Sequence, residues 1–401
     1  MKILIVIHGF PPEYMAGSEV YTYHLAKELS KSHEVFIFHR IENPFINEYE
    51  LIETSFHGLN KFVLNIPYLP HYFEGRYINE KVDSIFSDLL KRIKPDLVHF
   101  GHLNYLSTNL PRITKEYDVP TIYTLHDFWL YCSRGQLINR RDDSLCNTIN
   151  YNNCSQCLEE YLPEKSNEKI NNRFKYIQTN VVDHIDHFIA PSKFLLEKMV
   201  ELGLPQEKVS YLDYGFNFEF FKDYRKTLSE KIRFGYIGRI IPAKGIHLLI
   251  DAFNLIKSKN AELLIYGSSS SLEFLKNRAK NTNIHFLGGY ENWEIGEVLS
   301  DIDVLIVPSI WFENSPLVIH EASIVNIPII TSNIGGMAEY VKDGVNGLLF
   351  ERNNSFDLKE KIESIINNPE QIDYLSNNAL KVDSIEDHVK KLEEIYYSLI
   401  K

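Results

Sequence analysis

Several features common in other protein classes are missing from this chain of 401 residues. No stretch contains the roughly 18 uninterrupted apolar residues that a membrane-spanning helix requires. Lysine and arginine number 42 against 54 aspartates and glutamates, a formal charge of −12, which argues against a nucleic-acid-binding surface. The P-loop motif is absent, which argues against a P-loop hydrolase. Gly-x-Gly-x-x-Gly does not follow the first apolar run, which argues against a nicotinamide dehydrogenase.

The amino-terminal apolar run, Lys2–Ile7, is too short for a secretory signal and is followed by no cleavage site. We therefore expect a cytoplasmic protein, and peripheral association with the inner face of a membrane stays open.

Cysteine is scarce, and all four cysteines fall within 26 consecutive positions, at Cys132, Cys146, Cys154 and Cys157. Such clustering in an insert near residues 130–162 has two interpretations: a tetrahedral structural zinc site, or a set of unliganded thiols. Disulfides are not expected in a cytosolic protein. Rich in Asn, Arg and Asp, the insert is also placed to influence the choice of acceptor.

Short apolar runs alternate with amphipathic segments through both halves, a pattern typical of parallel sheets covered by helices. We expect strands in the first half at Lys2–His8, Glu34–His39, Lys61–Ile66, Leu97–Phe100, Thr121–Leu125 and His187–Pro191. In the second half we expect them at Ile232–Ile237, Ala261–Tyr266, Asn283–Leu287, Val304–Pro308, Pro328–Thr331 and Gly347–Phe350. The sequence thus predicts an α/β fold of two Rossmann-like domains, residues 1–214 and 215–401, that face each other across a cleft. The last helix is expected to cross back onto the first domain.

Ligands of such sheets bind where strands end, so the loops that follow strands are the place to look for function. After the strand Ile232–Ile237 comes a turn that begins at Gly238 and carries Arg239 and Lys244 ahead of a helix. Two fixed cations at a strand-to-helix turn favour an anion, and a diphosphate fits this place. The alternative is that both are solvated surface cations.

A second loop, after the strand Val304–Pro308, carries Glu313, and Glu321 follows in the next helix. Ser315 is expected to cap that helix, with Pro316 at its first position. Carboxylates accept hydrogen bonds from paired hydroxyls such as those of sugars and ribose. Two glutamates eight positions apart, however, are most often solvated.

These motifs together resemble the retaining glycosyltransferases of family four. The resemblance rests on Gly238-Arg239, Lys244-Gly245, the Glu313 and Glu321 pair, and the segment Ile334 to Gly347, in this order. It implies the GT-B architecture and transfer of a sugar from a nucleotide-sugar donor to a hydroxyl acceptor, with no metal needed for the chemistry. UDP- and GDP-sugars both stay open as donors, as do a glycan and a lipid-linked sugar as acceptors.

The resemblance also implies roles for residues. Arg239 and Lys244 would hold the donor diphosphate, Glu321 the ribose hydroxyls, and Leu287 would lie near the base. Glu313 would bind the donor sugar together with the backbone of Asn314, Ser315, Pro316 and Leu317.

In the first half, His126-Asp127 resembles the family's histidine-bearing loop. By that resemblance His126 would contact the donor sugar, and Asp127 would orient the His126 ring or an acceptor group. The alternative is that His126 is simply packed or solvated. Gly17 belongs to the first turn, which resembles the acceptor and phosphate loop, although Ala16 replaces one of two glycines common there. The rival hypothesis is a non-catalytic GT-B subunit that holds a nucleotide sugar and activates a partner.

Overall fold

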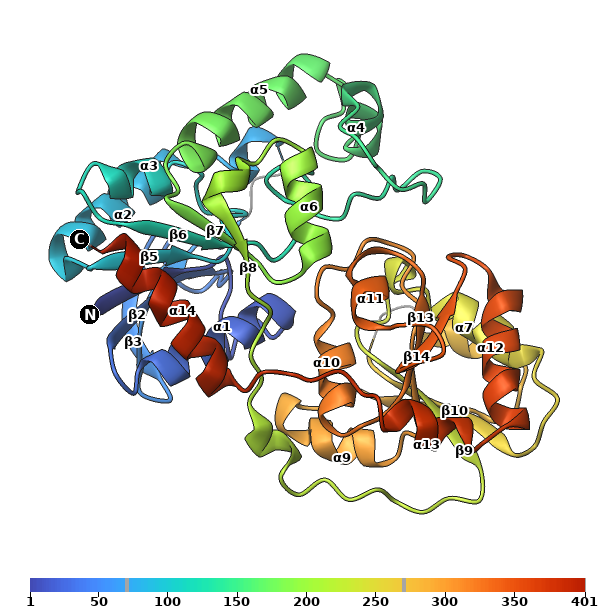
Figure 1. Ribbon diagram of the computed structural model, residues 1–401. Helices are drawn as coiled ribbons and strands as arrows, with labels where there is room; N and C mark the ends of the chain where they lie inside the picture. Colours follow the sequence, from blue (N-terminus) through green and yellow to red (C-terminus); the bar gives the residue numbers. More distant parts are fainter. Residues whose placement is uncertain (69–71, 269–271, 401) are drawn as a thin grey trace. The chain divides into compact units, whose positions relative to one another are not determined.

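The computed structural model describes residues 1–68, 72–268 and 272–400. The chain divides into two compact units (Figure 1). The first unit contains Met1–Gly215 and the segment from Asp383 onward, and the second contains Phe216–Val382. Within the described residues, no helix is both long and apolar enough to cross a membrane.

The first unit is built on a sheet whose described strands follow the order β3-β4-β2-β1-β5-β6-β7-β8. All neighbours are parallel except β3, which pairs antiparallel with β4. The strands are β1 (Lys2–Val6), β2 (Glu34–Ile41), β3 (Leu51–Phe56), β4 (Leu59–Asn65), β5 (Leu97–Phe100), β6 (Thr121–Thr124), β7 (His187–Ala190) and β8 (Val209–Tyr211).

Helices cover this sheet, and side-chain caps fix where several of them begin. Asn79 accepts from the Val82 amide at the start of α2, and Ser192 accepts from the Leu195 amide at the start of α6. The helices are α1 (Gly17–Leu29), α2 (Glu80–Ile93), α3 (Leu110–Lys115), α4 (Tyr151–Cys157), α5 (Asn167–Ile177), α6 (Lys193–Glu201) and α14 (Ile385–Leu399).

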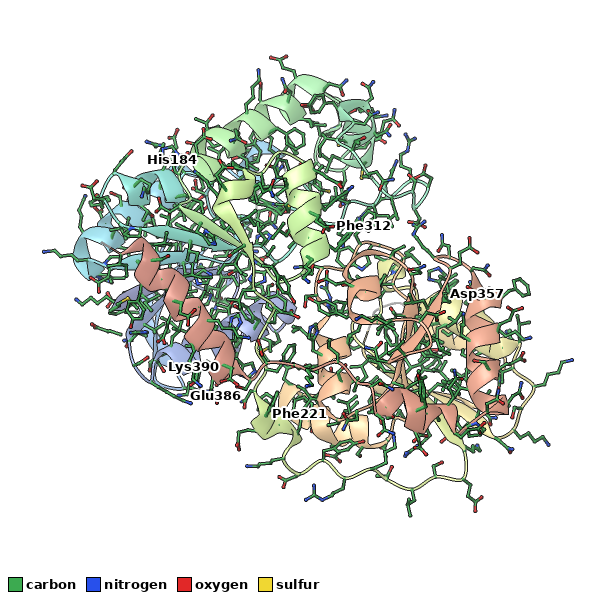
Figure 2. The ribbon with its side chains drawn as sticks, in the orientation of Figure 1. His184, Phe221, Phe312, Asp357, Glu386 and Lys390 are labelled. Carbon is green, nitrogen blue, oxygen red and sulfur yellow. The ribbon has the colours of Figure 1, made fainter. Side chains whose placement is uncertain are left out.

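The last helix, α14, lies beside α1 in the first unit (Figure 1). The hydroxyl of Tyr21 is 2.8 Å from His388 Nε2, and the hydroxyl of Tyr396 is 2.5 Å from His99 Nδ1. All four side chains are buried. Glu386 and Lys390 of the same helix are exposed and are labelled in Figure 2. The carboxyl-terminal helix is therefore held to the first unit by an apolar face with two buried hydrogen bonds.

The second unit is an entirely parallel sheet, in the order β11-β10-β9-β12-β13-β14 among its described strands. The strands are β9 (Ile232–Ile237), β10 (Ala261–Tyr266), β11 (Ile284–Gly288), β12 (Val304–Val307), β13 (Ile329–Ser332) and β14 (Gly347–Phe350). The helices are α7 (Ile246–Asn254), α8 (Leu272–Arg278), α9 (Ile295–Ser300), α10 (Leu317–Ile324), α11 (Gly335–Tyr340), α12 (Ser355–Asn367) and α13 (Gln371–Ser376).

Strand β12 shows why these apolar runs form central strands. Val304 and Ile306 belong to one buried cluster, and Leu305 and Val307 belong to another. Because successive side chains of a strand point to opposite faces, a run that is apolar at every position must be covered on both. The expected α/β fold with parallel sheets is confirmed, and twelve of the described strands lie at or within two residues of the expected positions at each end.

Two strands of the first unit were not expected from the sequence, β3 and β8. In β3 all side chains are exposed or half-buried, and it pairs antiparallel at the edge of the sheet. Strand β8 has only three residues and forms the opposite edge. An edge strand pairs with one neighbour only and is partly exposed. It therefore needs no apolar run and leaves little signal in the sequence.

Candidate functional site

In the second unit, the loops after the neighbouring strands β9 and β12 lie against each other. The Ile310 amide donates to the Ala243 carbonyl at 2.9 Å. Gly245 has φ +69°, and a Cβ added to it would stand 1.9 Å from the Pro308 carbonyl oxygen. Only glycine fits this close approach. The sequence of the turn therefore brings Lys244, the residue before Gly245, next to the loop that carries Glu313.

Lys244 and Glu313 form an ion pair, with 2.6 Å between Lys244 Nζ and Glu313 Oε1. The same oxygen accepts from Ser309 Oγ at 2.7 Å and from Trp311 Nε1 at 2.8 Å. Lys244 Nζ also lies 5.7 Å from the centre of the Trp311 ring. The Glu313 side chain is buried and the Lys244 side chain is one-quarter exposed. Three donors on one oxygen fix the carboxylate, while the ammonium group stays within reach of solvent.

The backbone behind Glu313 rests on α11. The Gly336 amide donates to the Glu313 carbonyl at 2.9 Å, and a Cβ on Gly336 would stand 1.5 Å from the Asn314 carbonyl oxygen. Asn314 and Ser315 are buried. Phe312 of the same loop is labelled in Figure 2 and is buried as well. The segment Ile334 to Gly347, singled out in the sequence, thus supports the Glu313 loop.

The expected helix start at Ser315 is wrong by one residue. The N-cap of α10 is Pro316, whose ψ of 114° is extended, and the helix begins at Leu317. The Pro316 carbonyl accepts from the Ile319 amide at 3.0 Å and lies 3.2 Å from His320 Nδ1. Pro316 itself thus stays outside the helix, in the N-cap position that the sequence predicted for Ser315.

Glu321 lies in α10, half-buried. Burial raises the pKa of its carboxyl from 4.5 to about 7, against an opposing effect from His320. The nearby Tyr290 phenol has its pKa raised, first by burial and then by the charge of Glu321. This carboxyl is therefore close to half-protonated at neutral pH.

Arg239, Gly238 and Leu287 occupy the rim of the same sheet. Gly238 and Arg239 follow β9, and the Tyr236 hydroxyl donates to the Arg239 carbonyl at 2.7 Å, which fixes the backbone of the turn. The Arg239 side chain is exposed. Leu287 lies in β11, at the edge of the sheet, and is 48% exposed. The apolar Leu287 side chain is thus accessible to a planar ligand.

In the first unit, four titratable residues follow the adjacent strands β1, β5 and β6: His8, His102, His126 and Asp127. The His8 and His102 rings have centroids 4.5 Å apart, and His102 Nε2 is 3.4 Å from Asp127 Oδ2. Glu19 of α1 completes the group, with Oε1 3.2 Å from His8 Nε2. Gly17 is exposed at the beginning of the same helix, whose N-cap is Ala16.

Two contacts hold the His102 ring in place. The Asn104 amide donates to His102 Nδ1 at 3.1 Å, and His102 Nε2 faces Asp127. Although burial opposes it, the charge of His102 and its hydrogen bond hold the pKa of Asp127 below its ordinary value. Asp127 Oδ1 also accepts from the Trp129 amide at 2.8 Å. The Asp127 carboxylate is therefore fixed in place and ionised.

Glu19 and His126 have strongly shifted pKa values. Burial alone would raise the pKa of Glu19, but the hydrogen bond from His8 brings it down to about 2. Burial, with the charge of His102, lowers the pKa of His126 to about 3. His126 Nδ1 lies 2.7 Å from the Tyr214 hydroxyl. At neutral pH, His126 is an uncharged imidazole.

Sequence reasoning selected His126 and Asp127 but gave no role to His8, Glu19 or His102. Both missed histidines come two residues after the end of a buried strand, at the carboxyl edge of the sheet. That position was the available signal.

The four cysteines are all free thiols and half-buried. In the described part of the chain, no group of three or more His, Cys, Asp or Glu side chains is arranged to hold a metal ion. The cysteines nevertheless line one common pocket.

Comparison with known proteins decides the family. Residues 15–220 match the description Glycosyltransferase Family 4, and residues 218–382 match Glycosyl transferases group 1. The chain belongs to glycosyltransferase family 4. This family consists of retaining glycosyltransferases, which generally need no metal ion.

Curated relatives of this family 4 chain include proteins of capsule synthesis. The capsular polysaccharide biosynthesis glycosyltransferase CapM of Staphylococcus aureus is 31% identical over 49% of this chain and 57% of CapM. An uncharacterized glycosyltransferase of Methanocaldococcus jannaschii, MJ1607, is 23% identical over 92% of this chain and 90% of its own length. The match to CapM therefore spans little more than half of that relative.

Solved structures show that the family 4 chain has the GT-B fold over its length. Anabaena HepE in complex with UDP and glucose is 16% identical and covers 100% of both chains with a TM-score of 0.71. Sucrose-phosphate synthase of Thermosynechococcus elongatus is 17% identical, with 99% of this chain and 98% of that chain covered and a TM-score of 0.74.

Proposed function

We propose that this protein transfers a hexose from a nucleotide sugar, a UDP- or GDP-sugar, to a hydroxyl group of a glycan or lipid-linked acceptor, with retention. Family membership supports the reaction class. The relatives support a place in polysaccharide or glycolipid assembly, since one is a capsular polysaccharide enzyme and another is a poly(ribitol-phosphate) α-N-acetylglucosaminyltransferase. A lipid-linked acceptor would bring the otherwise cytoplasmic protein to the inner face of a membrane.

The observation that carries the proposal is the Lys244–Glu313 pair between the ends of β9 and β12. Lys244 has an ammonium group within reach of solvent, and it shares the turn with the exposed Arg239. We assign the donor diphosphate to these two cations. Glu313, anchored through Oε1, offers Oε2 to the hydroxyls of the donor sugar, next to the Asn314–Leu317 backbone.

The other predicted site residues are assigned to the ribose, the base, the transferred sugar and the acceptor. Glu321 accepts from the ribose hydroxyls, and Leu287 provides an apolar surface for the base. From the first unit, His126 donates a hydrogen bond to the transferred sugar, and Gly17 lies in the loop that receives the acceptor. His126 cannot serve as an acid at neutral pH, because its pKa is about 3.

The step we propose is substitution on one face of the sugar. The bond between the anomeric carbon and the diphosphate oxygen breaks, the acceptor oxygen bonds to the same face, and the acceptor proton passes to the departing phosphate. Arg239 and Lys244 stabilise the negative charge that develops on the leaving group. No resident metal ion takes part in this step.

The experiment is a transfer assay over a panel of nucleotide sugars, with released nucleotide and glycosylated acceptor measured separately. Glu313→Ala and Arg239→Ala are each expected to reduce transfer strongly. Glu273→Ala is the matched control, because Glu273 forms an exposed surface pair with Lys276 at 3.2 Å. Unchanged transfer in both site variants would refute the assignment. Donor binding by calorimetry without transfer to any acceptor would favour the non-catalytic subunit instead.

A further inference from the structure

The insert between β6 and α5 contains all of the cysteines of the chain. Cys154 and Cys157 lie three positions apart in α4, on one face of a single helical turn. Figure 1 shows α4 beside α5, and the two helices are in contact. Cys132 and Cys146 come from the loop that precedes α4.

The backbone of this loop turns sharply around its two cysteines. The Cys132 amide donates to the Phe128 carbonyl and the Gly135 amide to the Cys132 carbonyl, both at 2.7 Å. The Cys146 amide donates to the Leu137 carbonyl at 2.8 Å, beside an antiparallel bridge between Ile138 and Leu145. Cys132 is thus held in a tight turn and Cys146 in a short two-stranded ladder.

All four cysteines line one small pocket. The sulfur-bearing side chains converge on it from the turn, the ladder and the helix. The rest of its lining includes apolar side chains of α5 and of the loop, among them Leu137, Ile138, Ile170 and Phe174. One helix turn with two cysteines, opposite two cysteines from loops, supplies the four ligands of a tetrahedral site.

Apolar packing holds the two ends of the insert, where Leu137, Ile138, Leu158 and Leu162 are buried, but not its middle. Helix α4 has the sequence YNNCSQC, with Tyr151 as its only large apolar residue, and Tyr151 is exposed. Residues 140–154 have no buried member. A seven-residue helix is unstable by itself in water, and small lobes without an apolar core commonly require a metal ion or disulfides.

We propose that Cys132, Cys146, Cys154 and Cys157 bind one structural zinc ion. Thiolates are soft ligands, and four of them select zinc over magnesium or calcium. In the present arrangement the thiols surround the pocket without forming a ligand set, so binding draws them inward. Four sulfur–zinc bonds form and the thiol protons are released to solvent. This inference does not depend on the proposed sugar transfer.

The proposed ion would also brace the loop of Asp127. The Phe128 amide donates to the Gly135 carbonyl at 3.1 Å, and a Cβ on Gly135 would stand 2.3 Å from Asp127 Oδ2. The turn that begins at Cys132 therefore packs directly against the Asp127 carboxylate. Metal binding in the insert would hold this carboxylate in position.

The test starts with the full-length protein, purified under reducing conditions without chelator. Elemental analysis is expected to find one zinc per chain, and thiol titration after denaturation with a chelator is expected to find four thiols. The Cys154→Ser/Cys157→Ser double variant should lose the zinc. Gln156→Ala, a change at an exposed residue of the same helix that does not line the pocket, should retain it.

Two results would overturn the proposal. One is fewer than four thiols in protein handled without reductant and without metal, which would show disulfides. The other is four thiols, no zinc as purified, and no uptake when zinc is added to the reduced protein. If the double variant does not fold, cobalt binding to the metal-free wild type decides the matter, because thiolate ligation gives an intense charge-transfer absorption that oxygen ligands do not.

Discussion

Glu19 in the first unit and Glu321 in the second each lie in a helix that follows a central strand, yet their carboxyls have opposite pKa shifts. Both lose hydration. Glu19 gains a hydrogen bond from His8, and its pKa is about 2. At Glu321 burial dominates, and its pKa is about 7. A buried carboxyl stays charged only where a partner offsets the lost hydration.

The loops after β9 and β12 also differ in charge from the loops after β1, β5 and β6. At the β9 and β12 loops, formal charges dominate: Lys244, Arg239 and Glu313. At the β1, β5 and β6 loops, the imidazoles of His8 and His126, whose pKa values are lowered by burial, accompany the carboxylates of Glu19 and Asp127. The first arrangement suits a diphosphate, and the second suits hydroxyl groups, which both donate and accept hydrogen bonds. Substitutions in the charged loops and in the imidazole-bearing loops are therefore expected to have different effects.

The largest effect is expected from removal of the fixed cations. Lys244→Ala and Arg239→Ala should each lower kcat/KM by roughly 10² to 10³, because each removes charge stabilisation from the departing diphosphate. Steady-state kinetics with saturating acceptor measures this. Lys276→Ala removes an exposed lysine of the same unit and should leave kcat/KM unchanged. A loss below threefold in both site variants would contradict the charge side of the contrast.

A smaller effect is expected from His126. His126→Ala should lower kcat about tenfold, the loss of one hydrogen bond of roughly 1.4 kcal/mol. Because the pKa of His126 is about 3, the variant should keep the wild-type pH profile between pH 5 and 8. His184→Ala, a change at a half-buried histidine of the same unit (labelled in Figure 2), is the control. If a limb of the wild-type dependence of kcat on pH is missing in His126→Ala, then His126 titrates in this range and the prediction is wrong.

A still smaller effect is expected from the titration of Glu321. Its carboxylate accepts two hydroxyls only when ionised, so donor affinity should rise several-fold as the pH increases through about 7. Calorimetric titration with a nucleotide sugar at several pH values measures the affinity. Glu321→Gln should bind more weakly and show no such rise. The same pH dependence in the variant would assign it to another group.

The two glutamates also predict opposite pH effects on the free energy of unfolding. The raised pKa of Glu321 means that folding favours its protonated form, so stability declines as the pH rises from 4.5 to about 7. The lowered pKa of Glu19 gives stability that is present above 4.5 and is lost as the pH falls toward 2. Denaturant unfolding of Glu321→Gln should lack the first decline, and Glu19→Gln should lack the second loss. Identical profiles for wild type and variants would rule out both shifts.

The sequence predicts central strands well because each is apolar at nearly every position. Ile232–Ile237 and Ala261–Tyr266 coincide with β9 and β10 for this reason. It does not predict β3, whose side chains are largely exposed at an edge. The signal comes from burial on two faces, which edge strands do not have.

For the sites, the sequence predicts which loops matter but not which residues meet. It selects Lys244 and Glu313 as separate ligands, whereas the structure pairs them through the close approach at Gly245. The contact of His8 with His102 depends on β1 and β5 being neighbours in the sheet. These residues are 94 positions apart in sequence, and strand order is set by packing of the whole sheet. Their roles in binding remain predictions.

The most direct measurement compares how UDP and UMP, or GDP and GMP, bind to the wild type and to the Arg239→Ala/Lys244→Ala double variant. Calorimetry should show that the diphosphate binds the wild type at least tenfold more tightly than the monophosphate, since only the diphosphate engages both cations. The double variant should bind the two nucleotides with similar affinity. An unchanged preference for the diphosphate in the double variant would contradict the assignment of the leaving group to this turn.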